Sequence, residues 1–591
     1  MDIVLPGGVA VEVAAASPAS EESRPHIEKS QSLCEDGDCD AALAAIEAAA
    51  ASLPGDASVH SQRGRVLLAL GRHADALAAA DRAVSLEAGL GGAHECRALA
   101  LAAIGRHGDA VGALGEAIRL DPKSPVHYRA RSAVHRDAGS PEAALADLQA
   151  AVSLDGEDSS THLEMGVVLA GLGRRGEAEA ALARAAELDP NIAEAHARRA
   201  TLLLDLGRHR EALGALDREV ALAPTHVAHL RRARALGALG HLEEAAAALD
   251  RAIALDPHDA GAHLKRGIAL RRLGRHEEAL ASMARALELE PEMPGAHLIR
   301  AYALADIGRA AEALESFRRA ERLEPGRPGI RLSIGKALFN LGRDDEALAE
   351  FAREEEADPA SAGAHLGKAI VMRRRGHHGK ARDAFARAVE LEPRNARARL
   401  GLGQALADLG DAGGALAELD RVAELDPNDE LVHQCRGLAL HALGRDEDAL
   451  EALGRAAPLD RDWLEIHLCR GAVLARLGRF AEALDSLEWA IRLNPAVAAC
   501  HAMRASALVS MGRSSEALAA CDHALGLDPG SARAHGVRGA ALSGLGRHAE
   551  ALEAYERAAE LDPGSTMARL GRRHALARLG RAGEGLAAGA G

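Results

Sequence analysis

Residues 263–291 read HLKRGIALRRLGRHEEALASMARALELEP, and this stretch determines the fold. Small or apolar residues such as Gly267 and Leu270 recur at helical spacing in its first half, which predicts an amphipathic helix. Gly274 then allows the chain to turn. Two glutamates open the second half, where they face the positive end of a second helix dipole. Pro291 ends this helix, because proline cannot continue it.

The same pattern is repeated along the whole chain of 591 residues. An alanine stands five residues after each of the first sixteen spaced glycines, and a proline stands seventeen residues after thirteen of them. The glycines are 34 residues apart, except that Gly207 and Gly240 are 33 apart, and they lie at positions 37, 71, 105, 139, 173, 207, 240, 274, 308, 342, 376, 410, 444, 478, 512, 546 and 580. A fixed period of this length is typical of helical repeat proteins.

This pattern resembles the tetratricopeptide repeat (TPR). The resemblance implies an all-α fold, a right-handed α-solenoid superhelix of about sixteen tandem helix-turn-helix repeats plus a C-terminal capping helix. Its expected parts are a flexible N-terminal tail over 1–22, the solenoid over 23–565, and the capping helix with a Gly/Ala-rich tail over 566–591. Each repeat would bury its apolar side only against its neighbours, so the array would share one continuous core. In this family a partner peptide lies in the concave groove.

The composition of the chain argues against several classes of protein. Aromatic residues make up 2% of the chain, which indicates a core of Ala and Leu, and the net charge of −16 argues against a nucleic-acid binder. The sequence contains no run of ~20 apolar residues that would span a membrane. An acid stands near the N-terminus, where a signal peptide carries positive charge. Seven scattered cysteines do not form a disulfide framework, so we expect a cytoplasmic protein.

The fourth position of the first helix holds histidine in most repeats, and the seventh holds arginine in twelve, including Arg97, Arg232, Arg266 and Arg504. We interpret the imidazole as a substitute for the family's aromatic residue, with the arginine stem covering apolar surface and its head in solvent. Buried neutral rings of this kind predict a lower melting temperature at pH 5.5 than at pH 7.5. A metal ladder is not expected, because helices ~8–10 Å apart cannot share ligands of one ion. The same argument applies to the group His433, Cys435, His467, Cys469, Cys500 and His501. We therefore expect no metal and no cofactor.

Motifs for catalysis are missing from the sequence. No Gly-Lys pair follows a glycine at phosphate-loop spacing, and no serine occupies a GxSxG motif. Only some 22 residues at the N-terminus lie outside the repeats, so we expect that the protein is not an enzyme.

The family's groove positions are 2, 5, 6, 9, 12 and 13 of each first helix. Here position 5 is often leucine, and cations lie beside it in the middle repeats. The candidate partner-binding residues are Arg198, Arg231, Arg234, Lys265, Arg271, Arg272, Leu230, Leu264 and Leu298. A basic, leucine-lined stretch favours an acidic, amphipathic peptide, although ordinary solvated surface would give the same pattern. The residues of the family's carboxylate clamp for chaperone C-termini are not found.

Two functions remain open. We expect a scaffold that binds a partner protein or peptide in its groove. The alternative is a structural module that self-assembles through its ends or its outer face. RNA reading is the least favoured, because ten aromatic residues cannot line a stacking groove. The sequence leaves the partner's identity, the pathway and the oligomeric state open.

Overall fold

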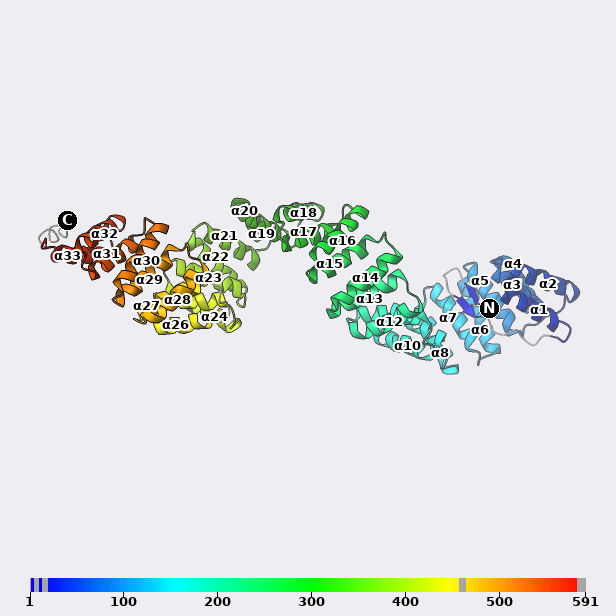
Figure 1. Cartoon of the computed structure of the whole chain (residues 1–591). Helices are drawn as coiled ribbons and strands as arrows, with labels where there is room; N and C mark the ends of the chain where they lie inside the picture. The colour runs from blue at the N-terminus through cyan, green and yellow to red at the C-terminus, as the bar shows by residue number, and fades with distance from the viewer. Residues whose placement is uncertain (1, 5–9, 13–19, 457–463, 582–591) are drawn as a thin grey trace. The chain divides into compact units, whose positions relative to one another are not determined.

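The computed structural model describes residues 2–4, 10–12, 20–456 and 464–581, which form thirty-three helices and two short strands (Figure 1). The strands are β1 (Asp2–Val4) and β2 (Ala10–Glu12). The helices up to residue 306 are α1 (Arg24–Glu35), α2 (Cys39–Ser52), α3 (Ala57–Ala69), α4 (His73–Leu86), α5 (Gly91–Ala103), α6 (His107–Leu120), α7 (Pro125–Asp137), α8 (Pro141–Leu154), α9 (Ser159–Gly171), α10 (Arg175–Leu188), α11 (Ala193–Asp205), α12 (His209–Leu222), α13 (His226–Leu239), α14 (Leu242–Leu255), α15 (Ala260–Arg272), α16 (His276–Leu289) and α17 (Pro294–Asp306).

The helices after residue 306 continue the pattern. They are α18 (Ala310–Leu323), α19 (Ile330–Asn340), α20 (Asp344–Ala357), α21 (Ala362–Arg374), α22 (His378–Leu391), α23 (Ala396–Asp408), α24 (Ala412–Leu425), α25 (Glu430–Ala442), α26 (Asp446–Ala456), α27 (Leu464–Arg476), α28 (Phe480–Leu493), α29 (Ala498–Ser510), α30 (Ser514–Leu527), α31 (Ala532–Gly544), α32 (His548–Leu561) and α33 (Thr566–Arg578). The predicted all-α solenoid of sixteen helix pairs and a last single helix is confirmed.

The chain forms two compact blocks, Met1–Ile307 and Gly308–Gly591. Within each block a helix packs mainly against the helix before it and the helix after it, so that the core runs from repeat to repeat. The odd-numbered helices are the first helices of the repeats, and the even-numbered helices are the second. None of the helices in the described ranges combines the length and the apolar character that crossing a membrane requires.

The spaced glycines make the turns, as predicted. All seventeen have positive φ, from 71° at Gly139 to 85° at Gly37. This left-handed conformation ends the first helix and is strained for a residue with a Cβ. After most of these glycines an arginine caps the second helix and binds an acid three residues later, as Arg275 does with Glu278 at 2.7 Å. The acids that were expected to face the helix dipole therefore also anchor the turn.

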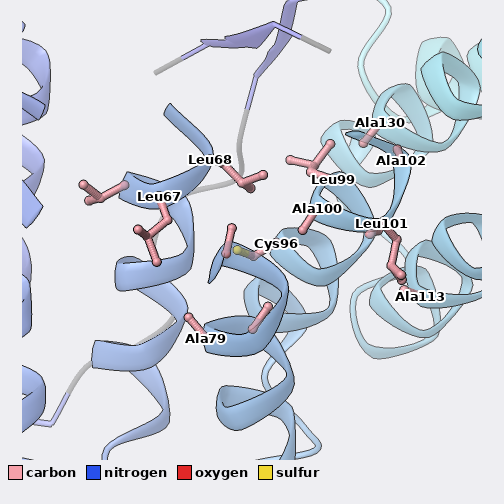
Figure 2. Close-up of a cluster of buried hydrophobic side chains, with 14 of the residues drawn as sticks. Leu67, Leu68, Ala79, Cys96, Leu99, Ala100, Leu101, Ala102, Ala113 and Ala130 are labelled. Atoms are coloured by element: carbon pink, nitrogen blue, oxygen red, sulfur yellow. The ribbon is translucent and has the colours of Figure 1, made fainter. Parts of the chain in front are cut away.

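The core is built from alanine and leucine. The alanine five residues after each turn glycine is fully buried in fifteen repeats, and Ala245 in the remaining one is 2% exposed. Figure 2 shows such packing around Leu67, Leu99 and Ala100. Where the second helix carries a larger residue, the first helix carries glycine. A Cβ on Gly335 or Gly367 would lie 2.5 or 2.6 Å from Phe351 Cε1.

The N-terminal region differs from its predicted structure, whereas the predicted C-terminal helix is present. Within 1–22, where a flexible tail was expected, the structure places a short antiparallel pair, β1 with β2, in the register Asp2↔Glu12, Ile3↔Val11 and Val4↔Ala10. β1 lies beside α3, and β2 lies beside α7. The expected capping helix is α33, whereas residues 582–591 of the Gly/Ala-rich tail lie outside the described residues.

Candidate peptide-binding groove

The recurring histidines have a structural role in the loops between repeats. In nine repeats the histidine Nε2 lies 2.8–3.2 Å from the carbonyl oxygen six residues earlier, as in His60 to Pro54 and His433 to Pro427. A carbonyl oxygen only accepts, so this geometry assigns the proton to Nε2. Where the position is not histidine, another donor takes the place: the Arg399 guanidinium donates to the Pro393 carbonyl at 2.7 Å. The ring ties the loop to the first helix.

The histidine and cysteine side chains do not form a metal centre in the described part of the chain, because it contains no group of three or more His, Cys, Asp or Glu residues that could hold an ion. The Cys435 sulfur instead accepts a hydrogen bond from Gln404 Nε2 at 3.7 Å. Burial raises the pKa of the Cys469 thiol to about 11, with further contributions from Glu465 and Cys435. Such a thiol stays protonated and is a poor ligand and nucleophile at neutral pH.

The arginines at position 7 join neighbouring repeats. Most of the paired arginines bind an acid on the second helix of the preceding repeat, usually sixteen residues earlier, as Arg266 does with Asp250 at 2.5 Å. Arg131 is an exception and binds Asp147 on the second helix of its own repeat at 2.6 Å. The expectation that these heads simply reach solvent was incomplete, because Arg97, Arg436 and Arg538 form the same pair. The signal that could have predicted the ladder is the acid ten residues after the turn glycine. Such partly exposed pairs contribute up to ~1 kcal/mol each.

A pocket of ≈ 470 Å³ lies on the groove face between α13, α14 and α15. It brings together five of the nine candidate residues. Its lining consists of Val227, Leu230, Arg231, Ala233, Arg234, Gly237, Leu242, Ala245, Leu249, Lys265, Ile268, Ala269 and Arg272. The walls are mainly apolar, and the four cations come from α13 and α15. Val227 and Ile268, which are 52% and 36% exposed, were not among the candidates although they occupy groove positions 2 and 9.

The four cations of the pocket are not equivalent. Arg231 binds Glu219 at 2.9 Å and donates to the Ala197 carbonyl oxygen at 3.0 Å. Burial raises the pKa of Glu219, and the Arg231 charge opposes that rise, so the pair is a structural link between α12 and α13. Arg234 lies 3.6 Å from Asp205. Much of the positive charge that the sequence suggested is therefore compensated.

Lys265 and Arg272 remain as exposed cations of this pocket that have no ion pair among the described residues. They lie on α15, with the exposed Ile268 between them in sequence. The Lys265 ammonium lies near the Asp259 carboxylate without a close ion pair. This ammonium and the Arg272 guanidinium, beside apolar walls, attract a ligand that carries both a negative charge and an apolar side chain. The pocket contains no arrangement of nucleophile and base, so its chemistry is that of binding.

The other four candidates lie elsewhere. Arg198 binds Glu194 at 3.1 Å and lines a neighbouring pocket of ≈ 520 Å³ on α9 and α11. Arg271 binds Asp306 at 2.9 Å and lies over the Tyr302 ring. Leu264 packs against α17 at Gly295, where an added Cβ would lie 3.3 Å from Leu264 Cδ2. Leu298 is buried. Leu264 and Leu298 thus connect successive first helices.

Comparison with protein families supports this architecture. The tetratricopeptide repeat model matches residues 27–90, 97–159, 163–227, 230–294, 269–328, 298–362, 366–430, 470–532 and 502–566. The chain belongs to the tetratricopeptide repeat family. Proteins of this family generally mediate interactions between proteins, and the matches do not include a catalytic domain. The comparison with curated proteins found no match.

Solved structures resemble this TPR chain at low identity. A chain of the APC/C hetero-tetramer Cut9–Hcn1 is 17% identical, with 87% of this chain and 95% of that chain covered and a TM-score of 0.38. A TPR protein from Parabacteroides merdae is 20% identical over 42% of this chain and 98% of its own, with a TM-score of 0.36. YrrB, described as a TPR protein with an unusual peptide-binding site, is 25% identical over 34% of this chain and 99% of its own, with a TM-score of 0.28.

Proposed function

We propose that this TPR protein is a non-enzymatic scaffold that binds an acidic, amphipathic peptide segment of a partner protein on its groove face. The observation that carries the proposal is the pocket between α13, α14 and α15, which combines apolar walls with the exposed cations Lys265 and Arg272. Its volume of ≈ 470 Å³ lies within the range of ~300–1,000 Å³ that is usual for binding pockets.

The expected binding mode follows from the lining. An apolar side chain of the peptide enters between Leu230, Leu249 and Ile268, while flanking carboxylates lie near Lys265 and Arg272. Burial of the apolar side chain supplies most of the affinity. The two cations select acidic flanks and raise the association rate, and this contribution decreases as salt screens the charges.

A display library of peptides that combine Glu or Asp with Leu, Ile or Phe tests the proposal. Peptides selected on the full chain are labelled and titrated against Lys265→Glu/Arg272→Glu. We expect at least a tenfold loss of affinity, together with a loss of salt dependence. Arg218→Glu/Arg251→Glu is the matched control, because it makes the same charge change at exposed positions of the second helices α12 and α14. Equal affinity of both variants, or no selected peptide, contradicts the proposal.

Self-association is a second candidate function, supported by one surface. On α33, Met567 and Leu570 are 47% and 56% exposed. An apolar face at the last described helix would suit end-to-end contact between copies. Sedimentation equilibrium tests this: the wild-type chain should dimerise, and Leu570→Lys should remain monomeric. A wild-type monomer at high concentration removes the candidate.

A further inference from the structure

Three successive repeats bury a groove position that the rest of the first block leaves accessible. At position 9, Arg65 on α3 is 8% exposed, Leu99 on α5 is 0% exposed and Ala133 on α7 is 2% exposed. The other position 9 residues of this block are half-buried or exposed, namely Gln31, Val167, Thr201, Arg234, Ile268 and Tyr302. Leu99 and Ala133 also belong to the apolar core of these repeats, so packing between the helices contributes to their burial. The burial of the charged Arg65 is not of this kind and points to an additional element that covers the groove face.

The burial extends to other groove positions of the same repeats. Ser61 and Gln62 on α3 are 7% and 3% exposed, and Glu95 on α5 is fully buried. The homologous Lys265 on α15 is exposed, although it occupies the same position as Gln62. The covered surface is thus polar and charged, and it is unlike the apolar interior between the helices.

The N-terminal strands lie at this surface. β1 is next to α3 and β2 is next to α7, and α5 lies between these helices in the array. Figure 2 shows the two strands together with the helices that carry Leu68, Leu99 and Ala130. The repeats with a buried position 9 are the same ones that the strand pair spans.

The strand pair depends on this surface for its stability. Each strand has three residues, and an isolated two-stranded hairpin is at best marginally stable in water. Its register pairs Asp2 with Glu12, and directly opposed like charges destabilise a sheet. Packing against a larger body is therefore needed to hold the strands together.

The charges of the two partners are complementary. Residues 1–22 contain Asp2, Glu12 and two further glutamates but no lysine or arginine. Of the helices next to the strands, α3 carries Arg65 on the groove face, whereas Arg129 on α7 already forms ion pairs with Asp158 at 3.1 Å and Glu164 at 3.5 Å. The segment is also rich in valine, isoleucine and alanine. It has the acidic, apolar character that a groove of this kind attracts.

We propose that the N-terminal segment, through its strands β1 and β2, is a tethered ligand of the chain's own groove, with β1 beside α3 and β2 beside α7. It occupies this part of the groove in place of an external peptide. A partner of the same chemistry gains access to these repeats only by displacing the segment, whereas the pocket between α13, α14 and α15 remains open. The occupancy itself does not depend on the binding activity of that pocket.

Hydroxyl-radical footprinting of the full chain tests whether the segment covers the groove. The variant Asp2→Lys/Glu12→Lys reverses the charge of the strand pair, and Glu21→Lys/Glu22→Lys makes the same charge change at exposed residues outside it. We expect the oxidation rates of Leu68 and Leu99 to rise at least threefold in the first variant and to stay at the wild-type value in the second. The rate of Ile268 should not change in either, because the segment does not cover α15.

Two results of the footprinting experiment would overturn the tethered-ligand proposal. Unchanged rates at Leu68 and Leu99 in the charge-reversed strand pair overturn the proposal. A wild-type protection of Leu99 that is lost on dilution also overturns it, because the segment would then come from a second copy.

A labelled peptide of residues 1–19 tests the occupancy in a second way. We expect it to bind the full-length Asp2→Lys/Glu12→Lys variant at least tenfold more tightly than the wild-type chain, in which the tethered segment competes. The same peptide with lysine at both acidic positions should bind neither. Equal binding to the variant and the wild type, or no binding to the variant, refutes a tethered ligand. Neither measurement involves Lys265 or Arg272, so its failure is distinguishable from failure of the peptide-binding function.

Discussion

Replacing Gly367 with alanine tests the size matching between helices. In an exposed helix interior, Gly→Ala stabilises by ~0.5–1 kcal/mol. At Gly367 the added Cβ would lie 2.6 Å from both Cε1 and Cζ of Phe351, which is about 1 Å closer than van der Waals contact. The Phe351 ring is 1% exposed and also faces Gly335, so it cannot simply swing away. Overpacking of this kind costs ~1–3 kcal/mol, so we expect net destabilisation.

The size-matched partner substitution should reverse the effect. Leucine occupies the position of Phe351 in other repeats, such as Leu216 on α12, where the following first helix carries Arg231, a residue with a Cβ, at the position of Gly367. Phe351→Leu alone leaves unfilled space and should cost roughly 1 kcal/mol. In Gly367→Ala/Phe351→Leu the new methyl group fills part of that space. We therefore expect a favourable coupling free energy of ~1–2 kcal/mol in the double-mutant cycle.

Native-state hydrogen exchange is the suitable assay, because each repeat contacts only its neighbours and the change should be concentrated in α20 and α21. Amides of these helices should exchange faster in Gly367→Ala and return towards wild-type rates in the double variant. Gly214→Ala on α12 is the control, since its Cβ would meet no atom within 4 Å, and it should stabilise its helix. If Gly367→Ala stabilises as much as Gly214→Ala, or if the two substitutions at the contact are additive, the size-matching argument is wrong.

Other features of the repeat lead to three further predictions. Burial lowers the pKa of His127 and of His229 below the unfolded value of ~6.5. The folded chain therefore binds fewer protons in acid than the unfolded chain, and it is fully stable only above that pH. Calorimetry should give a lower melting temperature at pH 5.5 than at pH 7.5, and an equal or higher melting temperature at pH 5.5 contradicts this prediction. In a double-mutant cycle of Arg266→Ala and Asp250→Ala, urea unfolding should give a coupling free energy of ~0.2–1 kcal/mol. This coupling should decrease at 1 M salt, and a salt-independent value would mean that the arginine acts through packing alone. Gly274 has φ of 74°, so Gly274→Ala should destabilise the turn between α15 and α16 by ~1 kcal/mol, measured as faster local hydrogen exchange, and unchanged exchange would refute the strain.

The fold could be predicted from the sequence because each repeat has the same residue types at positions with the same structural requirement. Gly274 and its equivalents must adopt positive φ, and the alanine five residues later must be buried, so one repeat predicts the others. The ion-pair ladder was also within reach of the sequence, since Asp250 and Arg266 recur as a spaced pair. It was missed because the arginine was assigned to a single helix face rather than to the boundary between repeats.

The binding residues of the groove were harder to predict. The position of a residue on its helix determines whether its side chain faces the groove, but whether its charge is paired depends on residues of neighbouring helices. Arg231 and Lys265 occupy the same position of adjacent repeats. Arg231 is compensated by Glu219 on the preceding second helix, and Lys265 has no such acid. The sequence does contain this difference, since Ala252 stands where Glu219 would recur, but the repeat pattern does not indicate that this position faces the cation. A sequence contains the partner acid, but only the folded arrangement shows whether it reaches the cation.

The strand pair was missed for a different reason. The segment outside the repeats has two apolar runs on either side of Pro6-Gly7-Gly8, and two such runs separated by turn residues are a hairpin signal. Three-residue strands with Asp2 opposite Glu12 would not form alone, so the signal becomes meaningful only when the covering surface is known.

The two groove regions of the first block follow from one physical condition. A groove residue needs either a neighbour within the array or an external partner to compensate its charge or its apolar surface. At Arg231 the neighbour is Glu219, and at Arg65, Leu99 and Ala133 the cover comes from outside the repeats. At Lys265 the described structure shows no close ion pair, although Asp259 lies nearby, and the α13–α15 pocket leaves its apolar walls open to a ligand. We therefore expect charge reversal at Lys265 and Arg272 to abolish peptide capture without changing the protection of Leu99, and charge reversal of the strand pair to have the opposite effect. A single variant that changed both would show that the two regions are coupled and would contradict the independence of neighbouring repeats on which the reasoning rests.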